Sequence, residues 1–502
     1  MRKSYNVLLK LFKEACVLEE VNNLLYWDRD VTMPKKGGKQ RADQVALISE
    51  LEHERRIDPR VDELLKFILN HEDYNNLSDL EKRNVFVLQR EYNRLVNVPA
   101  DFVGEFNKQG VLSNEAWEKA KDQSDFSIFL PELEKMVNLN KKYANYLNPE
   151  IDPYDALMDY SEPGMTQEKF ELLVNPLKEV IVPLIKECQQ SSHQPKKNIL
   201  TRKVPIDLQK KLNLDVLNVI GYDFERGRLD ETVHPFTSGS YDDVRITTKY
   251  FENNFLSALM STMHEAGHGE YEHFVGKNGR YQPVGMWCSD GVHECSSRFY
   301  ENFIGRSLAF WKFYLPKFKE FTGEIFTDVV LKDLVHVINQ AEPSAIRADA
   351  DELTYDLHII LRFELERDLM NGRIEVKDLP TIWNEKVKTI LGYEVKNDAE
   401  GVLQDIHWSD GLMGYFPTYT LGNIYGAQIF NKLKEDIPDW EKEIEEGNLQ
   451  KVLNWFRTAV HEKGNLLDSY DLIEDITGEK VSSKYLADYL STKFNQLYKL
   501  NR

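Results

Sequence analysis

Apolar side chains recur at three- and four-residue spacing along the first 150 residues, which is the pattern of amphipathic helices. The spacing predicts long helices over residues 80–96 and 115–147, with their charged residues on the solvent side. Few turn signals interrupt this region, and the clearest are Pro34 with Gly37 and Gly38, and then Pro99. The first part of the chain is therefore predicted to be helical almost throughout.

The pattern changes between residues 230 and 250. Residues 244–250 alternate in polarity and are rich in β-branched side chains, so they predict a strand. This strand either offers an edge on which an extended peptide lies, or belongs to a small structural sheet. From about Val292 to the C-terminus the pattern is helical again. The sequence therefore predicts a mainly α fold with a small β-sheet.

A helix directly after the predicted strand carries the candidate chemistry. Residues 255–263 are apolar on nearly every side, which predicts a buried helix. His264, Glu265 and His268 follow in an H-E-x-x-H arrangement. Side chains four residues apart leave one face of a helix, so both imidazoles can bind one metal ion, and Glu265 can act as a general base on water. The alternative is that these histidines are surface or capping groups.

Two glycines inside this helix carry a further prediction. Gly267 and Gly269 each cost about 1 kcal/mol relative to alanine in a helix interior. A helix that carries such a cost usually needs room for a close neighbour, and we expect other elements to pack there.

A catalytic zinc site needs a third protein ligand. Position 274, where a third histidine of the extended motif would stand, is Phe, so a carboxylate on a later helix is favoured. Glu294 is the best candidate because it begins the next predicted helix. His293 and Glu301 remain as alternatives. The pair Cys288 and Cys295 is not favoured, because C-x6-C is not a usual ligand spacing.

Composition limits which binding partners and which cellular compartment are expected. The formal net charge of -20 argues against nucleic acid and against an anionic membrane, since both attract basic surfaces. No apolar run approaches the length of a membrane-spanning helix, and the N-terminus has no pattern of a signal peptide. The four cysteines are sparse and show no framework spacing, which fits a reducing cytoplasm.

Six motifs in order resemble the carboxypeptidase Taq (M32) family of zinc metallocarboxypeptidases. They are His234-Pro235-Phe236, Asp243-Val-Arg245-Ile-Thr247, His264-Glu265-x-x-His268, His293-Glu294, Ile346-Arg347-x-x-Ala350-Asp351 and Gly401-x-x-Gln404-Asp405-x-His407-Trp408. The likeness covers essentially the whole chain, 1–502. It departs at Cys295 and Ser296, where the family usually has Ser or Gly and then Gln, so the hydrogen bonds of those two side chains are in doubt.

The resemblance implies a large helical body with a long central substrate cleft. We expect one catalytic unit, with a helical lobe over about residues 1–200 and the metal-site core over about 200–502. It also implies a homodimer that releases single C-terminal residues, with broad specificity, from peptides with a free C-terminus. The implied cofactor is one Zn²⁺ ion, with Co²⁺ as a possible substitute, bound by His264, His268 and Glu294, with Glu265 as general base.

Further residues are predicted to contact substrate. A free α-carboxylate calls for a fixed arginine, and Arg347 is the first choice, with Arg245 next. The alternative for Arg347 is a structural ion pair with Asp349, Asp351 or Glu352. His234 and Tyr419 are also predicted to bind substrate.

The stretch 401–419 is rich in glycine and aromatic residues. His407 and Tyr415 in it resemble the His and Tyr that contact substrate in helical zinc dipeptidases such as angiotensin-converting enzyme, and we expect both to be catalytic. Otherwise these side chains pack the cleft wall.

Two other functions stay open at this level. One is an endo-acting zinc oligopeptidase, which would also cut peptides with blocked ends. The other is a non-catalytic scaffold that keeps the fold, but the presence of the complete set His264, Glu265, His268 and Glu294 argues against it.

Overall fold

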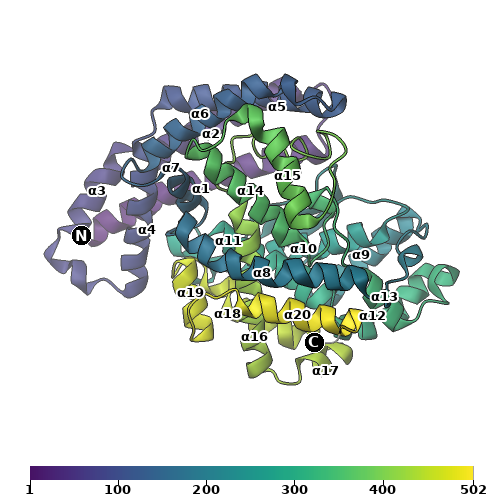
Figure 1. Cartoon of the computed structure of the whole chain (residues 1–502). Coiled ribbons are helices and arrows are strands. Elements are labelled where there is room, and N and C mark those ends of the chain that lie inside the picture. The colour runs from purple at the N-terminus through teal and green to yellow at the C-terminus, as the bar shows by residue number, and fades with distance from the viewer. Residues whose placement is uncertain (501–502) are drawn as a thin grey trace.

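The computed structural model describes residues 1–500, and nearly all of its regular structure is helical (Figure 1). This confirms the predicted mainly α fold with a small sheet. The first part of the chain forms α1 (Arg2–Val31), α2 (Gly38–Arg56), α3 (Pro59–Leu69), α4 (Asp79–Val96), α5 (Ala100–Gln123), α6 (Leu130–Leu147), α7 (Pro153–Ser161), α8 (Gln167–Gln190) and α9 (Ile206–Ile220).

The helix predicted over 80–96 is present as α4, but the prediction of one helix over 115–147 was wrong. The helix α5 ends at Gln123, because Ser124 takes the left-handed conformation with φ of 52°. Asp125 then accepts a hydrogen bond from the backbone of Ser127, and α6 begins at Leu130 with Pro131 in its first turn. Proline fits a first turn but not a helix interior, and this signal was missed.

A three-stranded sheet follows α9. It consists of β1 (Gly227–Glu231), β2 (Thr237–Ser240) and β3 (Asp243–Thr248), in the order β1-β3-β2. The strand β3 is parallel to β1 and antiparallel to β2. The predicted strand at 244–250 is therefore the central one, and it offers no edge to a peptide. An added peptide strand would have to pair with β1 or β2.

The rest of the chain builds the core around one buried helix, α10 (Phe255–Phe274). Its successors are α11 (Asp290–Arg298), a π-helix (Phe299–Gly305), α12 (Leu308–Thr322), α13 (Leu331–Ile338), α14 (Tyr355–Met370), α15 (Leu379–Leu391), α16 (Pro417–Asp436), α17 (Trp440–Glu445), α18 (Leu449–Ala459), α19 (Ser469–Thr477) and α20 (Lys484–Tyr498). Short 3₁₀ segments lie at Glu72–Asn76, Phe126–Ile128, Lys197–Ile199, Val275–Asn278, Pro283–Gly285, Gly323–Phe326, Arg347–Asp349, Val376–Asp378 and His461–Lys463.

One large hydrophobic cluster gathers residues between Ala120 and Tyr498, and a smaller cluster joins α1, α3 and α4 at the N-terminal end. The helices α8 and α20 lie side by side across the lower half of Figure 1, although they are far apart in sequence. The large cluster includes residues on both sides of position 200. The division into a lobe and a core near that position stays a prediction.

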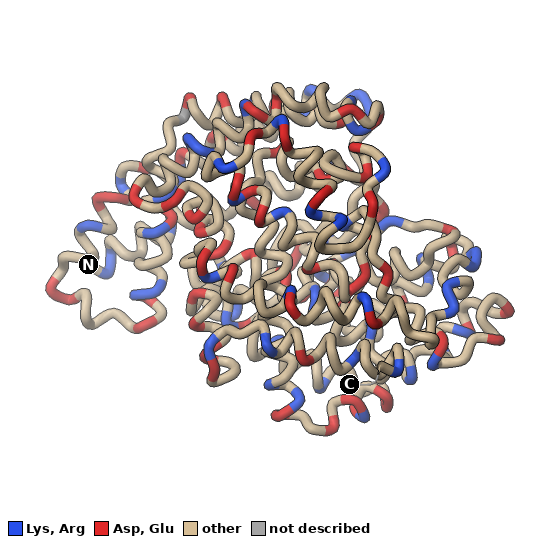
Figure 2. The backbone as a smooth tube through the Cα atoms, viewed as in Figure 1, with Lys and Arg blue, Asp and Glu red and all other residues tan. Residues whose placement is uncertain are grey.

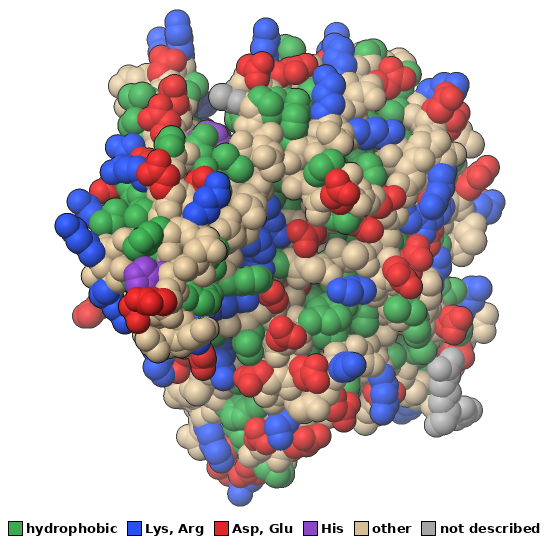
Figure 3. All heavy atoms as spheres, turned by 90° about the vertical axis from the view of Figure 1, so that its left-hand side faces the viewer, with side chains coloured by type: hydrophobic (Ala, Val, Ile, Leu, Met, Phe, Trp, Pro, Cys, Tyr) green, Lys and Arg blue, Asp and Glu red, His purple; other side chains and the backbone are tan. Residues whose placement is uncertain are grey.

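Charged residues of both signs are spread along the whole chain (Figure 2). On the face drawn in Figure 3, acidic and basic side chains are intermixed. Within residues 1–500, no helix combines the length and the apolar character that a membrane span needs. All four cysteines are buried.

Candidate metal centre and substrate pocket

Three side chains from two helices converge in the middle of the fold. In α10, His264 and His268 leave the same face one turn apart, and Glu294 approaches them from α11. The Nε2 atoms of His264 and His268 lie 3.8 Å from Oε2 and Oε1 of Glu294, respectively. Adjacent ligand atoms of a tetrahedral zinc ion are roughly 3.4 Å apart, so this donor set fits a metal ion with little movement. Their metal-binding atoms all lie within 4.8 Å of one another.

The position of Glu294 follows from two close helix contacts. A Cβ atom at Gly267 would lie 2.6 Å from the carbonyl oxygen of Ser296, so α11 rests directly on α10. A Cβ atom at Gly422 of α16 would lie 2.6 Å from the Cβ atom of Glu294. Gly269 similarly makes room for Tyr222 of the segment before the sheet. The prediction that Gly267 and Gly269 admit close neighbours is confirmed.

Ser296, where the sequence departs from the family pattern, forms hydrogen bonds at the contact between α10 and α11. Ser296 Oγ donates to the carbonyl oxygen of Gly267 over 2.6 Å. It also lies 2.7 Å from His461 Nε2, whose N–H it can accept. Ser296 therefore ties the two metal-site helices together, while Cys295 is buried in the core.

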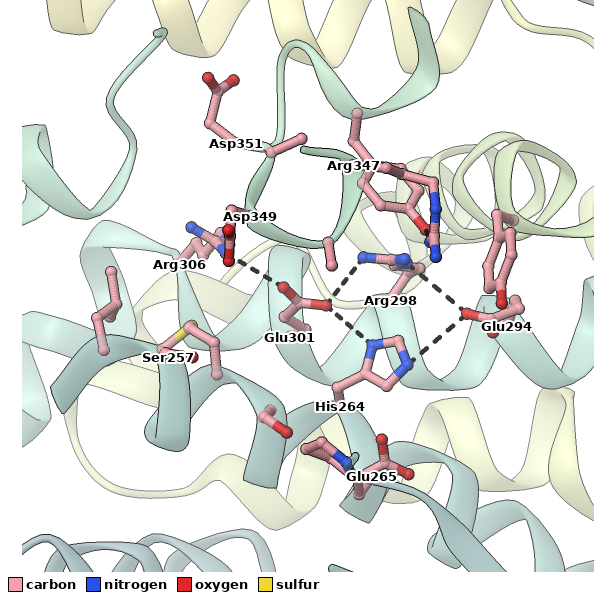
Figure 4. Close-up of a pocket in the computed structure, with 18 of the residues that line it drawn as sticks. Ser257, His264, Glu265, Glu294, Arg298, Glu301, Arg306, Arg347, Asp349 and Asp351 are labelled. Atoms are coloured by element: carbon pink, nitrogen blue, oxygen red, sulfur yellow. Dashed lines mark hydrogen bonds and ion pairs between the residues drawn. The ribbon is translucent and has the colours of Figure 1, made fainter. Parts of the chain in front are cut away.

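A carboxylate holds the ring of His264 from behind. Glu301 Oε2 lies 2.9 Å from His264 Nδ1, and the same carboxylate contacts Arg298 and Arg306 at 3.1 Å each (Figure 4). Burial alone would raise the pKa of Glu301, but the two guanidinium groups and His264 lower it far below its usual range. An ionised Glu301 accepts the Nδ1–H of His264, which leaves Nε2 free to bind a metal. Glu301 lies in the π-helix, a feature that often marks functional sites.

A second chain of hydrogen bonds holds His268. Its Nδ1 atom lies 2.5 Å from Nδ1 of His293, and His293 Nε2 lies 2.9 Å from Glu272 Oε1. A neutral His293 that donates its Nε2–H to Glu272 accepts at Nδ1 from His268, and Nε2 of His268 then keeps its lone pair. Burial and the neighbouring imidazoles lower the pKa of His268 well below its ordinary value, which favours the neutral ring that a metal binds.

His293 and Glu301, the two alternatives for the third ligand, thus lie on the other side of the histidine rings. Both His293 and Glu301 contact the Nδ1 atoms of the metal-site histidines, whereas Glu294 faces their Nε2 atoms. This arrangement favours Glu294 as the third ligand.

Glu265 projects from α10 into the same pocket and is only 6% exposed. The hydroxyl of Thr237 lies 2.7 Å from Oε2 of Glu265 and 3.0 Å from its backbone carbonyl oxygen. Burial raises the pKa of Glu265. A carboxylate in such surroundings takes up a proton more readily than an exposed one.

Arg347 also lines the pocket, but its ion-pair partner is a residue that the sequence did not indicate. Its Nε atom lies 2.9 Å from Asp405 Oδ1, and Nη1 donates to the hydroxyl of Tyr355 over 3.0 Å. Asp349, Asp351 and Glu352 do not make this ion pair; the other oxygen of Asp405 binds Arg362. Asp405 thus fixes the guanidinium group and leaves Nη2 for another partner.

The predicted residues of the 401–419 stretch divide into two groups. Tyr415 and Tyr419 line the pocket, whereas His407 lies behind them, with Nε2 3.2 Å from the hydroxyl of Tyr419. The ring of His407 stacks on Phe416 at 4.4 Å. Burial lowers the pKa of His407 to about 3, so the ring is neutral near neutral pH. His407 therefore reaches the pocket through Tyr419.

Two predicted substrate-binding residues lie outside the pocket lining. His234 is exposed between β1 and β2, although the following Pro235 and Phe236 do line the pocket. The guanidinium of Arg245 lies 4.4 Å from the ring centre of Trp27, and its Nε atom pairs with Asp243 over 2.7 Å. Their contacts with substrate stay a prediction.

The pocket itself has a volume of about 990 Å³, which suits a peptide segment rather than a single small ion. The sequence reasoning missed several residues that line the pocket or hold its side chains in place. Thr237 directly follows the quoted His-Pro-Phe motif and Asp405 lies inside another, so their motifs were the available signals. Nothing in local sequence indicated that Arg298 and Arg306 would meet at Glu301.

Comparison with known proteins gives matches along almost the whole length. The profile of the family described as "Carboxypeptidase Taq (M32) metallopeptidase" matches residues 7–494. The chain is 40% identical over 494 residues to carboxypeptidase 1 of Bacillus subtilis, covering 98% of each chain. It is 38% identical over 506 residues to thermostable carboxypeptidase 1 of Thermus thermophilus, covering 99% of each. The crystal structure of an M32 carboxypeptidase from Deinococcus radiodurans has a TM-score of 0.95 at 34% identity, covering 99% of this chain and all of that one.

Proposed function

The chain belongs to the carboxypeptidase Taq (M32) metallopeptidase family, and from this premise we propose a zinc-dependent carboxypeptidase that releases single C-terminal residues from peptides. Membership makes the chain a peptide hydrolase of the carboxypeptidase type; the metal, the roles of the residues and a broad specificity are the proposal. The observation that carries it is the convergence of His264, His268 and Glu294 on one point at the floor of the pocket, with Glu265 beside them.

His264, His268 and Glu294 would hold the metal, and two nitrogen donors with one carboxylate suit zinc, with cobalt as a chemically similar substitute. When bound, the metal supplies Lewis acidity toward a water molecule and toward the scissile carbonyl group. Glu301 and His293 keep the two imidazoles in the tautomer that exposes Nε2.

Glu265 is the proposed general base. Its buried carboxylate takes the proton of the attacking water and returns it to the leaving amine. Thr237 suits both states, because its hydroxyl can donate to the ionised carboxylate, or accept from the protonated one while donating to the backbone carbonyl of Glu265.

Tyr415 is the proposed donor to the oxyanion, since its side chain lines the pocket. Tyr419 binds substrate with its hydroxyl oriented by His407. Arg347 binds the C-terminal carboxylate, because Asp405 and Tyr355 fix its guanidinium group at the pocket wall. Roles for His234 and Arg245 would require substrate to extend beyond the pocket.

The test compares two peptides of one sequence, with a free and an amidated C-terminus, by mass spectrometry over time. The proposal predicts stepwise shortening of the free peptide and slow loss from the amidated one. Arg347→Ala should remove most of this preference. Internal cleavage of both peptides at equal rates would instead identify an endo-acting oligopeptidase.

We also propose a cytoplasmic homodimer that acts on peptides, without nucleic acid or membrane partners. The four cysteines are sparse and show no framework spacing, which suits a reducing compartment. The net charge of -20 disfavours binding to nucleic acid and to an anionic membrane. Light scattering of the purified chain measures the assembly, and a monomer at micromolar concentration would contradict the homodimer.

A further inference from the structure

The loop that carries His407 and Tyr415 is fastened from behind by one buried carboxylate. Glu366 of α14 has no exposed surface. Its Oε1 atom accepts the indole N–H of Trp408 over 2.8 Å. Its Oε2 atom accepts the backbone N–H of Gly414 over 3.0 Å and the hydroxyl of Tyr154 over 2.8 Å. A single side chain thus joins α14, α7 and two points of the loop.

The two points of attachment adjoin the two functional residues. Trp408 directly follows His407, and Gly414 directly precedes Tyr415. Gly414 has φ of 86°, and a Cβ atom there would lie 2.8 Å from Leu157 Cβ, so the loop is pressed against α7. The direction in which Tyr415 leaves the loop therefore depends on the position of the Gly414 amide.

A neighbouring arginine fastens the start of the same loop. Arg362, one turn before Glu366 in α14, donates to Gln404 and to Asp405 over 2.7 Å each. Asp405 in turn holds Arg347. One face of α14 therefore supports both ends of the loop, and Glu366 supports the end that leads to Tyr415.

Both side-chain oxygens of Glu366 must accept hydrogen bonds. Its partners are two N–H groups and one hydroxyl, and burying an ionisable carboxylate costs free energy that these donors must offset. A glutamine of the same size would turn its NH₂ group toward either the Trp408 or the Gly414 N–H. One of these two attachments would then face a donor and be lost.

Resting on the proposed function, we propose that Glu366 is the positioning residue for Tyr415. It fixes the loop through Trp408 and Gly414 and does not touch substrate. Its effect on turnover passes through the Tyr415 hydroxyl.

The experiment is a double-mutant cycle of Glu366→Gln and Tyr415→Phe, with kcat, KM and zinc content measured for each protein. Glu366→Gln should lower kcat by roughly 10- to 100-fold, the scale of a misplacement of about 1 Å, with KM and zinc content nearly unchanged. Tyr415→Phe should then cost much less in the Glu366→Gln background than in the wild type.

Tyr154→Phe is the matched control, because it removes one hydrogen bond of Glu366 and keeps both loop attachments. We expect its kcat within about threefold of the wild type, because Trp408 and Gly414 keep their hydrogen bonds to Glu366. If Glu366→Gln does not fold by circular dichroism, Trp408→Phe, which removes one attachment alone, takes its place in the cycle.

Additive losses in the cycle, or wild-type kcat in Glu366→Gln, would overturn the inference. So would wild-type kcat in Tyr415→Phe. These results leave C-terminal trimming by the wild type intact, whereas failure of the proposed function would abolish that trimming.

Discussion

Three buried carboxylates at the candidate metal site have different partners, and the partners indicate different roles. Glu301 contacts two guanidinium groups and an imidazole, which keeps it ionised. Glu294 faces the two Nε2 atoms. Glu265 has the hydroxyl of Thr237 as its neighbour, and burial raises its pKa. Environments that differ in this way separate a proton carrier, Glu265, from a carboxylate that stays charged, Glu301.

Glu265→Gln tests the role of the proton carrier. The amide keeps the shape of the side chain but cannot take a proton, so we expect a loss of turnover of about 10²- to 10⁴-fold. Zinc content by mass spectrometry should be unchanged, since Glu265 is not among the three converging ligands. Turnover at the wild-type rate would remove Glu265 as the base.

Glu294→Ala tests the third ligand. Loss of one of three donors should weaken zinc binding by 10-fold or more, measured by competition with a chromophoric chelator. Glu301→Gln is the matched variant, because it changes the partner of His264 and leaves all three donors in place. A larger loss in Glu301→Gln than in Glu294→Ala would reverse the assignment of the two carboxylates.

At this scale the sequence indicates the proposed metal ligands better than the side chains that hold them in place. H-E-x-x-H on a helix indicates His264 and His268, and a carboxylate at the start of the next helix makes Glu294 the first choice for the third ligand. The link from Arg347 to Asp405 spans 58 positions in the chain, and no local period encodes such a contact. His293 and Glu301 were seen as ligand candidates, because spacing alone does not distinguish a bond to Nε2 from a bond to Nδ1.

Among the elements, the contact of α10, α11 and α16 places Glu294 opposite the histidines. Glycine at 267 and at 422 lets the three backbones approach closely. The costs of glycine in helices predicted the neighbours of Gly267 and Gly269. Gly422 in α16 has an equivalent close contact, with Glu294.

Gly422→Ala tests this packing. The added methyl would lie 2.6 Å from Glu294 Cβ and 2.8 Å from its carbonyl carbon, so a backbone has to move. We expect a loss of about 1 to 3 kcal/mol in the free energy of unfolding and weaker zinc binding. Gly104→Ala in α5 is the control, since nothing lies within 4 Å of its new methyl. Equal effects of the two substitutions would contradict the account.

Other elements show where periodicity is insufficient. The helical pattern continues across Ser124 in sequence, but the local hydrogen bonds of Asp125 and the proline at 131 divide the chain into α5 and α6. The strand at β3 was recognised from its β-branched residues, yet its central position depends on β1 and β2, which are short and rich in polar residues. Pairing partners of this kind are not encoded within the strand itself.

On the scale of the whole molecule, acidic conditions should act through buried histidines outside the metal site. His336 is 6% exposed and packs on His193, and burial lowers its pKa to about 4, with the neighbouring His193 adding to the shift. The unfolded chain has a histidine pKa near 6.5 and therefore binds more protons than the native state between pH 4 and 6.5. This histidine thus removes stability as the pH falls through that range.

His336→Gln isolates the contribution. From pH 7 to pH 5 the wild type should lose up to about 2 kcal/mol more unfolding free energy than the variant, measured by urea denaturation. His234→Gln, at an exposed position, serves as the control. Parallel pH profiles of the wild type and His336→Gln would contradict the assignment.

C-terminal trimming should depend on the bound metal ion, and one digestion series tests both the trimming and this dependence. The wild-type protein is stripped with a chelator, given back Zn²⁺ in equal amount, and mixed with a peptide whose shortening is followed by mass spectrometry. We predict no shortening by the stripped protein and, after zinc is returned, loss of one residue at a time from the C-terminus. Trimming at full rate by the stripped protein, or internal fragments after zinc is returned, would contradict the account.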